Sequence, residues 1–161
     1  VGCGASEGQF ELTQLGFESG VGSLSQDFLK NRQDAIRWPE RLINRITFKR
    51  DIKNAVVVRK LDDLIDPNVK VDVIKIDVEG AELECLKGAT SILSRSRPKI
   101  LFELHTDADG SIGSFATFFE TLNYKLYIVE PNVEKDECAF RELTTLTPFK
   151  QYNILASANP L

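Results

Sequence analysis

The chain has 161 residues and a mass of 18.1 kDa, a length that fits one folded domain. Its 20 Lys and Arg against 24 Asp and Glu give a formal charge of −4 and a pI of about 5.1, which excludes a basic nucleic-acid-binding domain. The 42% of hydrophobic residues supply a core, so the chain is not intrinsically disordered. It has no apolar run of about 18 residues and no secretory leader, so we expect a cytoplasmic protein without a membrane partner.

Cysteine and methionine usage adds two expectations. Cys3, Cys85 and Cys138 show no short paired spacing, so the sequence predicts ordinary thiols and neither a disulfide framework nor a zinc site. The chain starts at Val1 and contains no methionine. We therefore interpret it as a piece of a longer protein, cut at Val1.

The first residues predict a turn followed by a strand. Gly2, Gly4 and Gly8 surround the turn, and apolar residues alternate from Gln9 to Leu12, as in a half-exposed strand. A glycine-rich nucleotide loop would need an apolar strand before it and a helix after it. Since neither is present, we interpret these glycines as a turn.

The next segments are less regular. Residues 25–48 fit a broken amphipathic helix, interrupted near Pro39, which we interpret as a surface excursion. Residues 56–58 predict a short strand. Residues 61–65 predict a turn of helix or a loop ahead of Pro67.

The centre of the chain predicts alternating strands and helices. Residues 71–76 form a β-branched strand, residues 79–94 carry apolar side chains at helical spacing until Pro98, and residues 100–104 form a second strand. The following helix is indicated by an apolar face of Phe115, Phe118, Phe119 and Leu122. Two more strands are predicted at residues 124–129 and 152–156. This order predicts a single α/β domain of parallel strands covered by helices on both faces.

Carboxylates follow the two central strands. Asp77, Glu79 and Glu82 come after the first strand, and His105 with Asp107 and Asp109 comes after the second. Parallel neighbours would bring these groups to the same edge of the sheet, where ligands bind in open α/β folds. Carboxylates at the start of a helix also cap free backbone N–H groups, so a purely structural role for Glu82 stays open.

Lys75 and Glu103 interrupt apolar strands and would be costly to bury alone, so we expect them to pair across neighbouring strands. His105 is the only histidine. Its position after a strand fits either a surface residue or a general base, because its ordinary pKa lies near neutrality.

The central sequence resembles the FkbM-type family of S-adenosylmethionine-dependent methyltransferases. The resemblance rests on VIKIDVEGAE at residues 73–82, LKGA at 86–89, RP at 97–98 and ILFE at 100–103. Leu61 and Asp62, and the GSL run at residues 22–24, resemble further family segments. The family resemblance covers roughly residues 1–131, and residues 132–161 are expected to hold a final antiparallel strand pair.

The resemblance implies one FkbM-like domain over residues 1–161, truncated at its N-terminus. The implied fold is a Rossmann-like class I methyltransferase sheet, mostly parallel with an antiparallel final strand and lacking its first strands. The glycine loop and the ribose-binding acidic residue would then lie upstream. An absent first strand would leave residues 71–76 at an open sheet edge, through which the chain is expected to associate with itself.

The implied activity is methyl transfer from S-adenosylmethionine to a hydroxyl oxygen of a sugar or other small metabolite. Asp77 would bind the cofactor or the nucleophile, and the acceptor site would be shaped by Glu79, Glu82 and Glu103, to which we add His105 from its position. Nothing in the spacing demands a metal. The alternative is a non-catalytic α/β module that binds or assembles with a partner without the cofactor loop.

Overall fold

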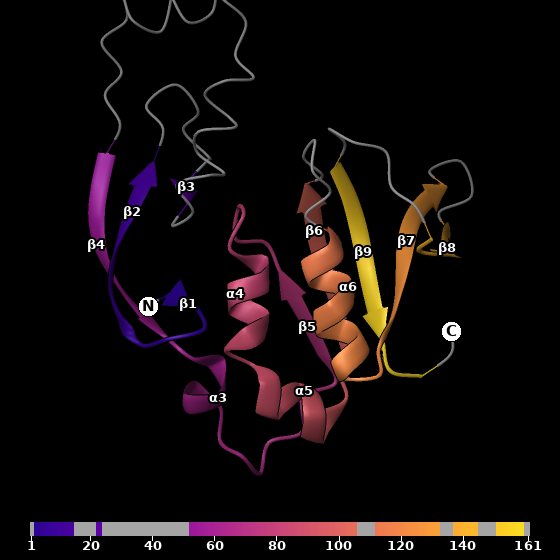
Figure 1. Cartoon of the computed structure of the whole chain (residues 1–161), viewed down its shortest axis with the longest axis horizontal. Helices are drawn as coiled ribbons and strands as arrows, with labels where there is room; N and C mark the ends of the chain where they lie inside the picture. The colour runs from indigo at the N-terminus through magenta and orange to yellow at the C-terminus, as the bar shows by residue number, and fades with distance from the viewer. Residues whose placement is uncertain are drawn as a thin grey trace, which may run out of the picture.

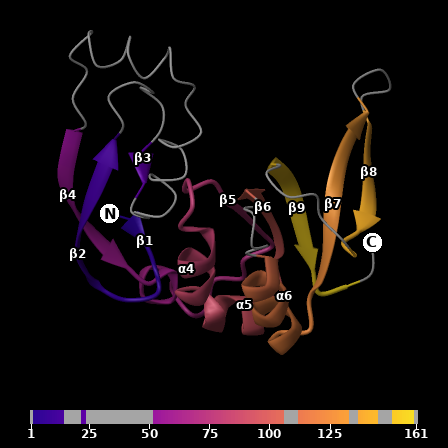
Figure 2. The ribbon, with the colours of Figure 1, turned by 45° about the horizontal axis from the view of Figure 1, so that its top comes forward.

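A computed structural model describes residues 2–14, 22–23, 52–105, 112–132, 137–144 and 151–159. Within these residues the strands form two separate sheets, as Figure 1 and Figure 2 show. The first sheet has the order β1-β4-β2-β3 and the second sheet has the order β5-β6-β9-β7-β8. The predicted segment at residues 25–48 lies outside the described residues.

The first sheet is built around a long antiparallel pair. Its strands are β1 (Gly2–Cys3), β2 (Gly8–Gln14), β3 (Gly22–Ser23) and β4 (Ile52–Arg59). β2 runs antiparallel to β4 along its whole length, and β1 adds to β4 in parallel. Residues 4–7 form the predicted turn before β2, but Gly2 lies in β1 and Gly8 begins β2, so only Gly4 of the three glycines lies in the turn.

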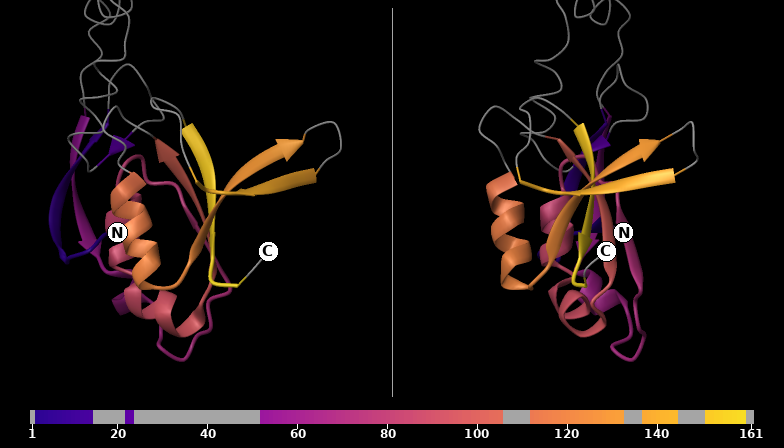
Figure 3. Two further views of the ribbon diagram at one scale, coloured as in Figure 1. Left: turned by 45° about the vertical axis from the view of Figure 1, so that its right-hand side comes forward. Right: turned by 90° about the vertical axis from the view of Figure 1, so that its right-hand side faces the viewer.

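The second sheet begins with the two central strands predicted from the sequence. Its strands are β5 (Val73–Ile76), β6 (Lys99–His105), β7 (Lys125–Asn132), β8 (Glu137–Glu142) and β9 (Gln151–Ser157). β5 and β6 are parallel, whereas β9 lies between β6 and β7 and is antiparallel to both. Figure 3 shows β7 and β8 extending beyond β9 as a two-stranded arm.

Four helices lie in the described part of the chain: α3 (Leu61–Leu64), α4 (Glu82–Lys87), α5 (Thr90–Ser96) and α6 (Ile112–Thr121). The short α3 confirms the helical turn predicted at residues 61–65. The single helix predicted at residues 79–94 is instead two helices, because the chain turns at Gly88 and Ala89.

The core lies between the second sheet and its helices. From β6, alternate side chains Ile100, Phe102 and Leu104 are buried against them. Phe102 stacks on Phe115 and Phe119 of α6, with ring centroids 5.4 and 5.7 Å apart. The predicted helical face that contains these two phenylalanines is therefore confirmed as a core face.

The predicted fold class is wrong. Strands hold more residues than helices, both sheets are mixed, and the only parallel pairs among the described strands are β1 with β4 and β5 with β6. The sheet is therefore not a mostly parallel Rossmann-like α/β sheet. The physical reason is visible in β5, where Ile76 is buried while Val73 is 65% exposed, so that one face lacks the expected helical cover.

Candidate functional site

The carboxyl ends of β5 and β6 lie at the same edge of the second sheet, where β9 begins (Figure 1). Ile76 and Phe102 are register partners. Asp77, which follows β5 directly, is therefore next to Glu103, which lies in the last part of β6. Glu79 follows in the turn after β5. We call Asp77, Glu79 and Glu103 the acidic rim.

Asp77 is half-exposed and has a cationic partner in the strand that precedes it. Lys75 Nζ lies 3.1 Å from Asp77 Oδ2, and both side chains are solvent-accessible. An exposed pair of this kind contributes at most about 1 kcal/mol to stability. A positively charged ligand group can therefore compete with Lys75 for the carboxylate at small cost.

The turn after β5 has an unusual backbone. Glu79 and Gly80 have φ values of 49° and 92°, in the left-handed region that a non-glycine residue enters at a steric cost. The carbonyl oxygen of Glu79 accepts a hydrogen bond of 2.5 Å from the hydroxyl of buried Ser23 in β3. The first sheet thus holds the strained turn of the second sheet in place.

The buried Glu82 carboxylate stabilises the same turn by accepting hydrogen bonds from its backbone. Its side chain is only 6% exposed, and its Oε1 accepts hydrogen bonds from the N–H groups of Gly80 at 3.1 Å and Val78 at 3.4 Å. The structural role left open by the sequence is therefore present in these contacts. The carboxylate lies within the turn and does not belong to the exposed rim.

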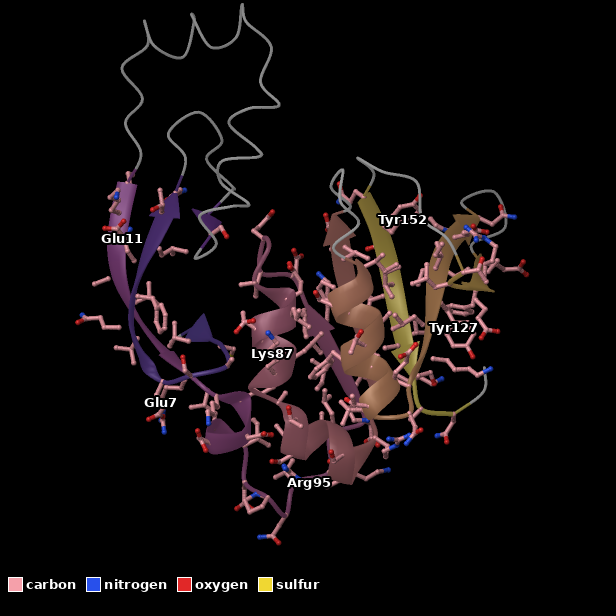
Figure 4. The ribbon with its side chains drawn as sticks, viewed as in Figure 1. Glu7, Glu11, Lys87, Arg95, Tyr127 and Tyr152 are labelled. Carbon is pink, nitrogen blue, oxygen red and sulfur yellow. The ribbon has the colours of Figure 1, made fainter. Side chains whose placement is uncertain are left out.

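Glu103 is partly buried and interacts across the sheet. Gln151 Nε2 of β9 donates a hydrogen bond to Glu103 Oε1. Gln151 is also the register partner of His105, which ends β6. The backbone thus places His105 at the same edge as the acidic rim, and Figure 4 shows the neighbouring Tyr152 at this end of β9.

The predicted pairing of Lys75 with Glu103 is wrong. Lys75 is opposite Leu101 in the register and pairs with Asp77, while Glu103 interacts with Gln151. Lys75 lies on the exposed face of an edge strand, so burial does not force it to find a partner on β6. Asp107 and Asp109 lie outside the described residues.

Two residues of this region carry little signal in the sequence. Ser23 lies within the GSL run that contributed to the family resemblance, but a serine alone does not predict a contact with the turn after β5. Gln151 precedes the strand predicted at residues 152–156 and has no motif around it. Only the tertiary pairing of β9 with β6 brings Gln151 to Glu103.

The N-terminal glycines do not serve as a cofactor loop in this arrangement. Gly4 is buried, and its carbonyl oxygen would lie only 2.1 Å from a Cβ built on Gly88. The Gly4 N–H donates to the carbonyl of Arg59 at 3.1 Å. These groups are therefore used in packing and in backbone hydrogen bonding.

Two further observations concern metals and membranes. Within the described ranges, no group of three or more His, Cys, Asp or Glu side chains is placed to hold a metal ion. None of the helices in those ranges is long and apolar enough to cross a membrane.

Comparison with known proteins gives one match. No curated protein and no solved structure matches the chain significantly. Residues 42–141 match the family described as the methyltransferase FkbM domain. This segment covers more than half of the chain and includes β5, α4, α5 and β6, together with the turn after β5 and all three residues of the acidic rim. The chain therefore belongs to the FkbM methyltransferase domain family.

Proposed function

We propose that this methyltransferase domain uses S-adenosylmethionine and transfers the methyl group to a hydroxyl oxygen of a sugar or another small metabolite. Family membership supports the reaction class. The acidic rim is the observation that supports the site, because it places carboxylates from two adjacent strands around one edge of the sheet. No nucleic acid or membrane partner is part of this proposal.

Each group of the site has a chemical task under this proposal. S-adenosylmethionine, when bound, supplies a methyl group on a positively charged sulfur. The Asp77 carboxylate binds the ammonium group of S-adenosylmethionine in place of Lys75, because its ion pair with Lys75 is exposed and weak. Glu103 or His105 receives the proton of the acceptor hydroxyl as the new C–O bond forms. Glu79 contributes to the acceptor side, and Glu82 keeps the turn closed.

A non-catalytic binding or assembly module is the second candidate. The observation that favours it is the packing of the N-terminal glycines against Gly88, which leaves the described residues without a glycine loop for a cofactor. A module of this kind would keep the turn and the rim without methyl transfer. Cofactor binding separates the two candidates directly.

The test is calorimetric titration of S-adenosylmethionine into the purified chain and its Asp77→Asn variant. We expect the wild-type chain to bind, and the variant to bind about 10- to 100-fold more weakly, since a hydrogen bond to a charged group contributes about 1.5–3 kcal/mol. Asp72→Asn is the matched control. Asp72 is also an exposed aspartate next to β5, paired with Lys70 at 2.8 Å, but it lies at the opposite end of the strand.

Each outcome decides between the candidates. Binding that Asp77→Asn weakens and Asp72→Asn leaves unchanged supports the proposed cofactor site. Absence of binding both to the wild-type chain and to a chain extended at its N-terminus contradicts it and favours the assembly module. When binding is seen, formation of S-adenosylhomocysteine in the presence of sugars and other hydroxylated metabolites identifies the acceptor class.

The proposed location is the cytoplasm. Cys3, Cys85 and Cys138 are all free thiols, as is usual for proteins of a reducing compartment. Fractionation of cells that express the full-length protein tests the location.

A further inference from the structure

Two thiols that are far apart in the sequence meet where the first sheet contacts α4. Cys3 belongs to β1 and Cys85 to the middle of α4. Cys3 packs against the core cluster that contains Cys85, and its thiol is among the groups that raise the Cys85 pKa. Cys85 is buried and Cys3 is partly buried. The two cysteines therefore lie where β1 of the first sheet packs against α4 of the core.

The surrounding backbone holds the two cysteines at this contact. Gly88 lies three residues after Cys85 and thus on the same side of the helix. The 2.1 Å between a Cβ built on Gly88 and the Gly4 carbonyl oxygen shows that the two backbones touch next to the thiols. The Asp62 N–H donates a hydrogen bond to the Gly88 carbonyl at 2.9 Å, and the Gly4 N–H donates one to the Arg59 carbonyl. The backbones of Gly4 and Gly88 are therefore both held by the short segment from Arg59 to Asp62.

We propose that Cys3 and Cys85 form an oxidative modification site, at which a peroxide converts the two thiols into a disulfide. The Cys3 sulfur attacks one peroxide oxygen, the O–O bond breaks, and Cys3 becomes a sulfenic acid as water leaves. The Cys85 sulfur then attacks the Cys3 sulfur, the S–S bond forms, and the S–O bond breaks. The departing hydroxide takes the Cys85 proton, so two thiols and one peroxide give one disulfide and two waters.

The exposure of the two thiols sets their order of reaction. Cys3 is partly accessible and meets the peroxide first. Burial raises the pKa of the Cys85 thiol to about 12, and neighbouring Cys3 and Glu82 add to the shift. A protonated, buried thiol reacts poorly with an oxidant in solution. Cys85 attacks the Cys3 sulfenic acid only as its proton passes to the departing hydroxide. This site is independent of the proposed methyl transfer.

The experiment oxidises the folded chain with hydrogen peroxide, blocks the remaining thiols with N-ethylmaleimide and measures intact mass. Because the chain has 3 cysteines, we expect one maleimide adduct instead of three, and the cross-link itself removes about 2 Da. Proteolytic mapping without reduction should recover the Cys3 peptide joined to the Cys85 peptide. The oxidised chain should also unfold at a higher urea concentration than the reduced chain.

Two variants make the assignment specific. Cys138→Ser removes an exposed thiol of β8 and should retain the cross-link, whereas Cys3→Ser should abolish it. Cross-links that involve Cys138, or complete alkylation of both Cys3 and Cys85 after oxidation, would overturn the proposal. A Cys3 to Cys85 link that forms in urea but not in the folded chain would also overturn it, since the folded contact is its cause.

Discussion

Glu82 is a buried carboxylate whose partners are backbone amides. Its Oε1 accepts from Gly80 and Val78, in the turn where Glu79 and Gly80 have positive φ. Removal of the carboxylate would leave two partly buried N–H groups without this acceptor in a turn that already carries backbone strain. Glu82 therefore contributes to the site by fixing the backbone from which Asp77 and Glu79 project, and its predicted catalytic role stays a prediction.

We expect Glu82→Ala to lower the free energy of unfolding by about 1–3 kcal/mol, because the two N–H groups of the turn lose their hydrogen-bond acceptor. Glu82→Gln retains a carbonyl acceptor and should lose less. Urea unfolding measures both. Glu84→Gln is the control on the same helix, because exposed Glu84 pairs only with exposed Lys87 at 2.6 Å and should change stability by less than about 0.5 kcal/mol. Equal losses of unfolding free energy for Glu82→Ala and Glu84→Gln would contradict a stabilising role of Glu82 in the turn.

Among individual residues, those of the rim could be predicted from the sequence and their partners could not. Asp77, Glu79 and Glu103 are visible because they follow or interrupt apolar strands in a motif of known type. The contacts of Ser23 with Glu79 and of Gln151 with Glu103 depend on segments distant in sequence. Local patterns contain no information about such pairings, and the same reason led to the wrong partner for Lys75.

At the level of elements, the contact between β1 and α4 depends on the absence of a side chain at Gly88. A Cβ there would meet backbone atoms of Gly4 at 2.1 and 2.9 Å, which cannot rotate away as a side chain would. We expect Gly88→Ala to destabilise the fold by about 1–3 kcal/mol through overpacking. Gly113→Ala in α6 is the control, because its Cβ would meet nothing within 4 Å, and better helix propensity should make that change neutral or stabilising. Thermal unfolding of both variants checks this prediction.

The start of α5 depends on a side chain from α3. The two carboxylate oxygens of Asp62 accept from the N–H groups of Ser91 and Ile92 at 2.8 and 2.9 Å. We expect Asp62→Ala to cost about 1–2 kcal/mol, as the loss of a helix N-cap does. Asp63→Ala, at the exposed neighbouring position, should cost much less in the same urea titration. A similar loss for both variants would show that the charge of the segment matters and the cap does not.

Several elements could be predicted because they have a buried face of their own. The strands around residues 71–76 and 100–104 and the helical face of Phe115 and Phe119 carry regular apolar spacing, and the structure confirms them. β8 lies in the region 132–161, where the resemblance implied an antiparallel strand pair, but its bounds could not be predicted because all its side chains are exposed, which removes any apolar alternation. The break between α4 and α5 was missed because apolar spacing continues through it, although Gly88 cannot extend the helix against β1.

For the whole molecule, the open edge of the second sheet is the feature with the clearest physical consequence. Among the described strands, β5 has a neighbour on one side only, and Val73 is 65% exposed. Unpaired edge strands with apolar side chains promote association. The structure agrees with the sequence that the strand around residues 71–76 is an edge, while the predicted parallel fold around it is wrong because β9 enters between β6 and β7.

We expect the chain to associate with itself in a concentration-dependent manner, and Val73→Lys to reduce this association because a charge at an edge disfavours pairing. Val69→Lys adds the same charge at another exposed valine outside the strand and should leave association unchanged. Sedimentation velocity over a range of concentrations measures all three proteins. A wild-type chain that stays monomeric throughout would contradict the prediction.

The position of β9 also affects how the protein is made. β6 and β7 are translated before β9, yet neither can complete its hydrogen bonds until β9 has entered between them. On the ribosome, the nascent chain must therefore keep two unsatisfied strand edges apart until residues 151–157 emerge, at about 5–20 residues per second. A pause in translation before this point prolongs the exposure of these edges to other nascent chains, so the late strand makes the yield of folded protein depend on the speed of synthesis.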